Sequence, residues 1–136
     1  MRHYHARFMR PIRVAETSEE DLKVVESLIA IQDAALYEVR AGVPASVPDA
    51  VYRDGVLSRG LRETYTNKTF YSVGLLLQPS GGEALEAAPG CTWHFETGMT
   101  FHTYVLARGF GMSETIAITD NGYDRLTRFA RHLFKT

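Results

Sequence analysis

The chain of 136 residues contains one cysteine, Cys91, and therefore cannot form an internal disulfide. A chain without disulfides is typical of a reducing compartment, so we expect a cytoplasmic protein. The sequence has no apolar run near the roughly 20 residues that a membrane-spanning helix needs. It also opens with alternating polar and apolar residues instead of the apolar block of a signal peptide. We therefore expect no membrane partner.

Neither sign of charge is in clear excess, because 15 Lys and Arg stand against 16 Asp and Glu, giving a formal net charge of −1. Nucleic-acid partners usually require a basic surface, so we expect no nucleic acid. The residues are 45% hydrophobic and 23% charged, which is typical of a globular chain. We expect a single domain over residues 1–136, which can bury a core without a metal or a disulfide.

The familiar motifs of metal sites and of nucleophilic catalysis are missing. The chain has five histidines but no HExxH pair and no paired CxxC, so spacing alone does not predict a metal site. Cys91 follows a Pro-Gly pair, and no serine lies in a GxSxG motif. The glycines near residue 81 lack the lysine of a phosphate-binding loop and indicate a turn. The acidic residues of the chain could form an acid–base pair for catalysis, and the alternative is that they are solvated carboxylates in loops.

Two helices are expected in the first half of the chain. The first begins with a capping box at Thr17 or Ser18, continues with apolar residues at helical spacing, and ends at Gly42. The second runs from Ser46 to Gly60, with a proline in its first turn.

The other segments show the patterns of strands and turns. Residues 3–14 alternate in part and predict an extended opening segment, with a proline suited to an edge or a bulge. Further strands are predicted at residues 69–77, 99–106, 112–119 and 123–129. A loop is predicted at residues 79–82 and a tight turn at 120–122. The order of one strand, two helices and four strands predicts an α+β fold.

Several motifs in this order resemble the C-terminal half of the catalytic domain of the creatinase/aminopeptidase family. They are YHARFMR (4–10), AGVPA (41–45), YSVG (71–74), FETGMTF (95–101), ET (114–115) and TDNGYDRL (119–126). The resemblance implies half of a pita-bread fold, a curved antiparallel sheet with two helices on one face. Residues 71–83 and 99–102 are most similar to the ectoine-hydrolase-like and creatinase-like branch, which opens small non-peptide C–N bonds.

The resemblance also assigns positions to the dinuclear metal centre of the peptidase branch. One aspartate would lie upstream of Met1, and the alignable ligand positions carry Arg7, Tyr71, Tyr104 and Ser113, with Glu114 next to the last. Arginine only donates hydrogen bonds, and neutral tyrosine and serine oxygens are poor ligands for a hard dication. We therefore expect no metal and no other cofactor.

The resemblance implies a hydrolase-like protein that acts on or binds a small polar C–N compound. Its candidate catalytic residues are His5, Glu83 and His102, which would activate water or a nucleophile. Arg10 would hold a substrate carboxylate and Tyr71 would donate to a developing oxyanion. Structural roles for these side chains remain the alternative.

A pita-bread domain consists of two similar halves, and this chain resembles one of them. A lone half leaves a sheet edge and an apolar flank uncovered, so we expect two copies to pair as a homodimer. A second reading is a catalytically inactive half-domain that binds a ligand or a partner protein. A third is that catalytic sequence upstream of Met1 is missing.

Overall fold

The computed structural model describes residues 4–75 and 85–136. The described residues form two helices and seven strands. In chain order these are β1 (Ile12–Arg13), α1 (Glu19–Tyr37), α2 (Ser46–Ser58), β2 (Phe70–Ser72), β3 (Glu86–Ala87), β4 (Thr100–Ala107), β5 (Phe110–Thr119), β6 (Gly122–Arg125) and β7 (Phe134–Lys135).

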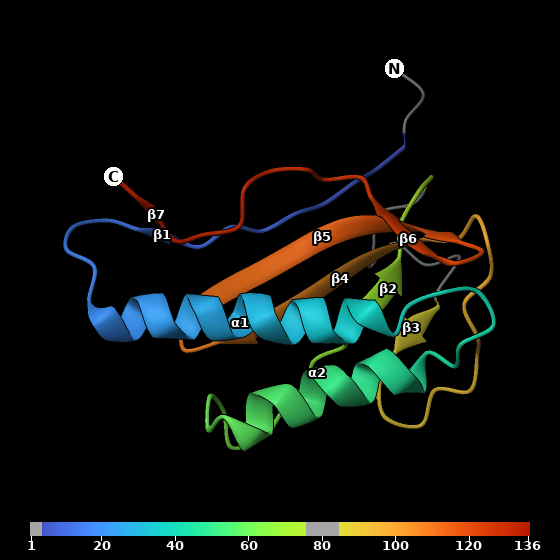
Figure 1. Ribbon diagram of the computed structural model, residues 1–136, viewed down its shortest axis with the longest axis horizontal. Helices are drawn as coiled ribbons and strands as arrows, with labels where there is room; N and C mark the ends of the chain where they lie inside the picture. The colour runs from blue at the N-terminus through green and yellow to red at the C-terminus, as the bar shows by residue number, and fades with distance from the viewer. Residues whose placement is uncertain (1–3, 76–84) are drawn as a thin grey trace.

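The main sheet has the strand order β3-β2-β4-β5-β6, and all of its neighbouring strands are antiparallel. Helices α1 and α2 pack against each other and cover one face of this sheet (Figure 1). Strands β1 and β7 form a separate parallel pair, which brings the N-terminal and C-terminal segments side by side (Figure 1). The predicted α+β fold, with an antiparallel sheet and two helices on one face, is confirmed.

Helix α1 begins at the second of the two predicted capping positions. The Ser18 hydroxyl accepts a hydrogen bond from the Asp21 amide at 3.0 Å, and the Asp21 carboxylate accepts one from the Ser18 amide at 3.2 Å. The helix ends at Tyr37, before the predicted end at Gly42. The Val39 amide bonds to the carbonyl of Leu36, three residues back, so a tighter turn replaces the last predicted helical turn.

Helix α2 has the predicted start and ends at Ser58, two residues before Gly60. Gly55 lies where α2 packs tightly against α1, since a Cβ atom there would lie 3.0 Å from the Ile31 side chain of α1. This glycine therefore permits close packing, which offsets its low helix propensity. Within residues 4–75 and 85–136, neither helix combines the length and the apolarity needed to cross a membrane.

Alternation along β4 separates the core from the opposite face of the sheet. Phe101, Thr103 and Val105 are fully buried beneath the helices, and the Thr103 hydroxyl shares a 2.7 Å hydrogen bond with Tyr52 of α2. His102, between two of these residues, therefore points to the other face. A cluster of edge-to-face aromatic rings fills the core between β2, β4 and α2.

Several sequence predictions need correction at their ends. The opening segment contributes only β1 and a single bridge from Met9 to Ser113, and the closing strand stops at Arg125 instead of residue 129. The predicted strand 69–77 is a strand over Phe70–Ser72, and its last two residues and the loop 79–82 lie outside the described residues. The turn at 120–122 is confirmed, since Thr119 pairs with Gly122.

Candidate functional site

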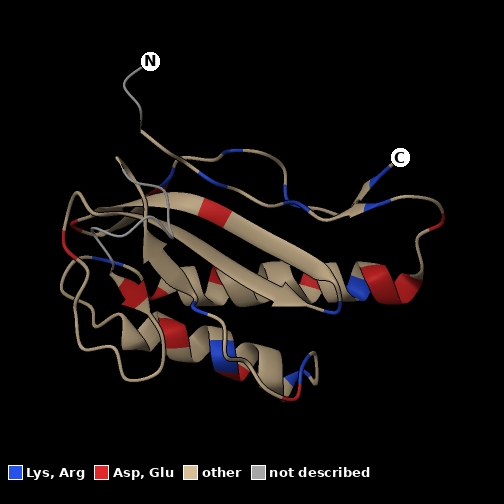
Figure 2. Cartoon of the chain, turned by 180° about the vertical axis from the view of Figure 1, so that it is seen from behind, with Lys and Arg blue, Asp and Glu red and all other residues tan. Residues whose placement is uncertain are grey.

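A cavity of about 520 Å³ lies on the face of the sheet opposite the helices. Its lining comes from the N-terminal segment, the loop before β2, and strands β2, β3 and β4. The polar side chains of this lining are Arg7, Thr66, Asn67, Lys68, Tyr71, Glu86, His102 and Tyr104. Because β4 itself carries no charged residue (Figure 2), the charges of the cavity come from the segments that flank it. We call this cavity the Arg7 pocket.

Sheet register brings the residues of the Arg7 pocket together. Tyr71 of β2 is the direct cross-strand partner of His102 in β4, and Tyr104 follows His102 on the same face. The N-terminal segment is fixed above them by Thr115 of β5. The Thr115 hydroxyl accepts a 2.8 Å hydrogen bond from the Arg7 amide and donates one of 2.7 Å to the Arg7 carbonyl. These two bonds fix the main chain of Arg7, which lines the pocket.

The Arg7 guanidinium donates a 2.6 Å hydrogen bond to the Tyr71 hydroxyl. Burial raises the pKa of Tyr71, and the nearby Arg7 charge opposes this shift only in part. Burial likewise raises the pKa of Tyr104, against a hydrogen bond from Asn67. Both tyrosines are therefore protonated at neutral pH and keep their O–H groups as donors.

His102 forms the floor of the Arg7 pocket between two tyrosine rings. Its ring centroid lies 4.8 Å from that of Tyr71 and 5.3 Å from that of Tyr104, and the side chain is only 2% exposed. Among the described residues, neither of its ring nitrogens has a hydrogen-bond partner. Burial, helped by the Arg7 charge, lowers the pKa of His102 to about 3, so the ring is neutral at physiological pH.

The positions that the resemblance assigns to metal ligands do gather at this pocket. Arg7 bonds to Tyr71, the rings of Tyr71 and Tyr104 lie 5.9 Å apart, and Tyr104 is the cross-strand partner of Ser113. Their chemistry does not fit a dinuclear centre, because a guanidinium repels a dication and no carboxylate occupies these positions. Within the described part of the chain, no three His, Cys, Asp or Glu residues are grouped to hold a metal.

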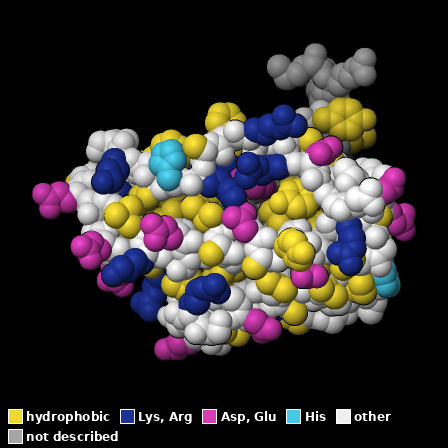
Figure 3. Space-filling model, in the orientation of Figure 1, with side chains coloured by type: hydrophobic (Ala, Val, Ile, Leu, Met, Phe, Trp, Pro, Cys, Tyr) yellow, Lys and Arg dark blue, Asp and Glu magenta, His cyan; other side chains and the backbone are white. Residues whose placement is uncertain are grey.

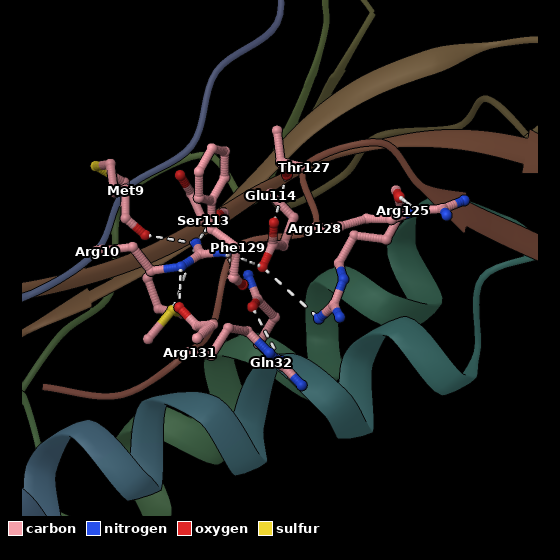
Figure 4. Close-up of polar contacts among 12 residues, drawn as sticks. Met9, Arg10, Gln32, Ser113, Glu114, Arg125, Thr127, Arg128, Phe129 and Arg131 are labelled. Carbon is pink, nitrogen blue, oxygen red and sulfur yellow. Dashed lines mark hydrogen bonds and ion pairs between the residues drawn. The ribbon is translucent and has the colours of Figure 1, made fainter.

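Arg10 belongs to a different cluster, on the helix side of β5 (Figure 4). Its guanidinium forms a 2.7 Å ion pair with the fully buried carboxylate of Glu114. The other donors bind the main-chain carbonyls of Met9, Ser113, Phe129 and Ala130 at 2.8 to 2.9 Å. All five N–H groups of Arg10 are thus engaged within the protein, which favours a structural role over the predicted binding of a substrate carboxylate.

The remaining predicted catalytic residues do not join His102 in the pocket. The His5 side chain is exposed and absent from the pocket lining, while its amide donates a 2.7 Å hydrogen bond to the carbonyl of Gly74. Glu83 lies outside the described residues. The structure therefore brings together Tyr71 and His102 from the predicted set and adds Arg7 and Tyr104, which sequence reasoning treated only as replaced ligands.

Comparisons with known proteins agree with this architecture. The model of metallopeptidase family M24 matches residues 1–120. A probable dipeptidase PepE from Mycobacterium bovis is 27% identical over 123 residues, which cover 88% of this chain and 32% of that protein. A Xaa-Pro dipeptidase from Pyrococcus horikoshii is 25% identical over 135 residues, with 96% of this chain and 38% of that protein covered.

Solved structures with the same fold include an X-Pro aminopeptidase from Thermotoga maritima, with a TM-score of 0.85 and 22% identity over 98% of this chain and 38% of that one. A recombinant prolidase from Thermococcus sibiricus has a TM-score of 0.80 and 28% identity over 95% of this chain and 35% of that one. The chain thus spans about a third of the length of the curated relatives it matches. With most of its length matched by the family model, the chain belongs to metallopeptidase family M24.

Proposed function

We propose that this chain is a metal-independent member of the family that binds a small polar compound in the Arg7 pocket. The observation that carries the proposal is the hydrogen bond from Arg7 to Tyr71, which joins two positions assigned to metal ligands by the resemblance. The guanidinium supplies a fixed positive charge where the metal ions of the peptidase branch would lie. A cavity of about 520 Å³ is suited to a small molecule.

The ligand of the proposed function is a C–N compound of the kind handled by the ectoine-hydrolase-like and creatinase-like branch. Binding is better supported than hydrolysis. Neutral His102 is a weak base at its lowered pKa, and the Glu86 carboxylate is already paired with Lys68. If a C–N bond is opened, Tyr71 is placed to donate its O–H to a developing oxyanion.

A thermal unfolding screen tests this proposal. The compounds are ectoine, creatine and proline-containing dipeptides, each added to protein freed of metal with a chelator, and Mn²⁺ and Co²⁺ are added alone in separate samples. A ligand present at about 100 times its Kd stabilises the fold by roughly 2.7 kcal/mol. We expect such a shift with one of the compounds and none with either metal.

The variant Tyr71→Phe removes one hydroxyl from the pocket and should reduce the ligand-induced shift. The matched control is Arg13→Gln, because Arg13 lies on the same N-terminal segment but its half-exposed side chain pairs with Asp21 at 3.3 Å, outside the pocket. This control should keep the full shift. Stabilisation by Mn²⁺ or Co²⁺ alone would contradict a metal-independent protein, and stabilisation by none of the compounds would contradict the proposed ligand class.

A second candidate function is that of a half-domain completed by association, most simply as a homodimer. It is favoured by the partial coverage of the relatives and by large apolar side chains exposed along the terminal segments, at the upper edge of Figure 3. These are Tyr4, Phe8, Ile12, Val14, Leu126 and Phe129. Light scattering at micromolar concentration should show a dimer that buries on the order of 1,600 Å². A stable monomer would exclude self-association as the function.

A further inference from the structure

Most of the donor capacity of Arg7 is unused by the residues that the structure describes. The guanidinium has five N–H groups, and its one described hydrogen bond goes to the hydroxyl of Tyr71. Its side chain forms no ion pair with any acidic residue in the described part of the chain. A cation placed over a cavity with unused donors is a natural partner for an anion.

The two tyrosine hydroxyls add donors to the same cavity. Tyr71 accepts a hydrogen bond from Arg7, and the ring of Tyr104 lies 5.9 Å from that of Tyr71 in the lining of the same cavity. The Tyr71 oxygen already accepts from a protein donor, which leaves its own proton free to point at a ligand. Because burial keeps both groups protonated, the pocket offers N–H and O–H donors from three side chains.

The balance of charge in the Arg7 pocket also favours an anion. Lys68 and Glu86 pair with each other, so their charges offset one another. His102 is neutral. Among the described residues that line the pocket, Arg7 therefore carries the one charge that has no opposite charge paired with it.

We propose that the ligand of the Arg7 pocket carries a carboxylate, bound between the Arg7 guanidinium and the hydroxyls of Tyr71 and Tyr104. This inference rests on the proposed function, since it names the group that the same pocket recognises. The parallel N–H groups of a guanidinium match the two oxygens of a carboxylate. A carboxamide has only one acceptor oxygen. Its N–H groups are donors and would face the donors of the pocket, so it should bind more weakly.

Fragment titrations followed by NMR test the inference without knowledge of the whole ligand. The probes are acetate and benzoate, each compared with its uncharged amide, acetamide or benzamide, at constant ionic strength. We expect the carboxylates to shift the resonances of Arg7, Tyr71 and Tyr104, and the amides to leave them in place. Arg7→Gln should weaken benzoate binding by about tenfold to a hundredfold, the range expected for a charged hydrogen-bonded contact.

Controls separate the carboxylate inference from the proposed function. Arg13→Gln removes the same charge from the same segment outside the pocket and should leave benzoate binding unchanged; an equal loss in this variant would overturn specific recognition by Arg7. Carboxylates that bind no better than amides would also overturn it. If the fragments fail in this way while compounds of the thermal screen still stabilise the protein, the carboxylate inference alone is wrong. If neither experiment detects binding, both proposals are wrong.

Discussion

Two arginines of the N-terminal segment, three residues apart, have opposite surroundings. Arg7 is exposed and lines the Arg7 pocket, and its one described side-chain hydrogen bond is donated to Tyr71. The Arg10 side chain is only 6% exposed, pairs with buried Glu114 and donates to four main-chain carbonyls. The two side chains thus lie on opposite sides of the sheet, although they share one short segment.

The contrast shows that hydrogen-bond saturation, more than residue type, separates a structural arginine from a binding one. The Arg10 cluster ties the N-terminal segment to β5 and to the chain after β6, because it bonds to Met9, Ser113, Phe129 and Ala130. Burial lowers the pKa of Arg10, although the charge of Glu114 opposes the shift. Such a cluster stabilises the fold and leaves no donor for a ligand.

The largest test of this contrast is Arg10→Gln. The substitution leaves the fully buried carboxylate of Glu114 without its close ion-pair partner, since the Arg125 guanidinium lies 3.8 Å away. Removing one partner of a buried ion pair typically costs about 3–5 kcal/mol. We expect a loss of that size in the free energy of unfolding, measured by urea denaturation.

The double variant Arg10→Gln with Glu114→Gln provides the control. It removes the buried charge along with its partner, so it should recover part of the stability that the single variant loses. A loss below about 1 kcal/mol in the single variant would be in the range of an exposed ion pair. Such a result would remove the distinction between the two arginines.

The sequence predicted much of the fold because its signals are local. The capping residue Ser18, the helical spacing of α1 and the alternation along β4 and β5 depend on neighbours within a few residues. The parallel pairing of β1 with β7 joins residues more than a hundred positions apart and gave no local signal. The two-residue strand β3 is too short to show a period of its own.

The candidate site was predictable only in part. Tyr71 and His102 were selected from the motifs, and the structure places them as cross-strand partners in the lining of the Arg7 pocket. Arg7 and Tyr104 could have been selected too, because residues that replace the ligands of one centre must still lie together. A structural role for Arg10 was the alternative drawn from the sequence, but its partners could not be predicted, since they include main-chain carbonyls of residues 113, 129 and 130, which sequence reasoning does not locate.

The pocket and the Arg10 cluster should also respond differently to acid, because the pocket contains a buried histidine without a described hydrogen-bond partner. The pKa of His102 is about 3 in the folded protein, whereas an unfolded histidine titrates near 6.5. Between these values the unfolded state binds one more proton at this residue, so stability falls as the pH falls. The contribution of His102 should approach about 1.4 kcal/mol per pH unit between pH 6 and 4.

Unfolding free energies measured across this range for His102→Phe should lack that part of the slope. The rings packed against His102 are those of Tyr71 and Tyr104, and because burial raises the pKa of both hydroxyls, both stay neutral between pH 6 and 4. His94→Gln alters an exposed histidine and should keep the full slope. An unchanged slope in His102→Phe would show that His102 is protonated in the folded state, and so is not buried as a neutral ring.

The smallest expected change in stability comes from Arg7→Gln, the same substitution that is severe at Arg10. Arg7 is exposed, and its one described side-chain bond, to Tyr71, can be replaced by water in an open pocket. We therefore expect the urea-unfolding free energy to change by no more than about 0.5 kcal/mol. A loss of several kcal/mol would place both arginines in the structural class, and the unused donors of Arg7 would then no longer mark a binding site.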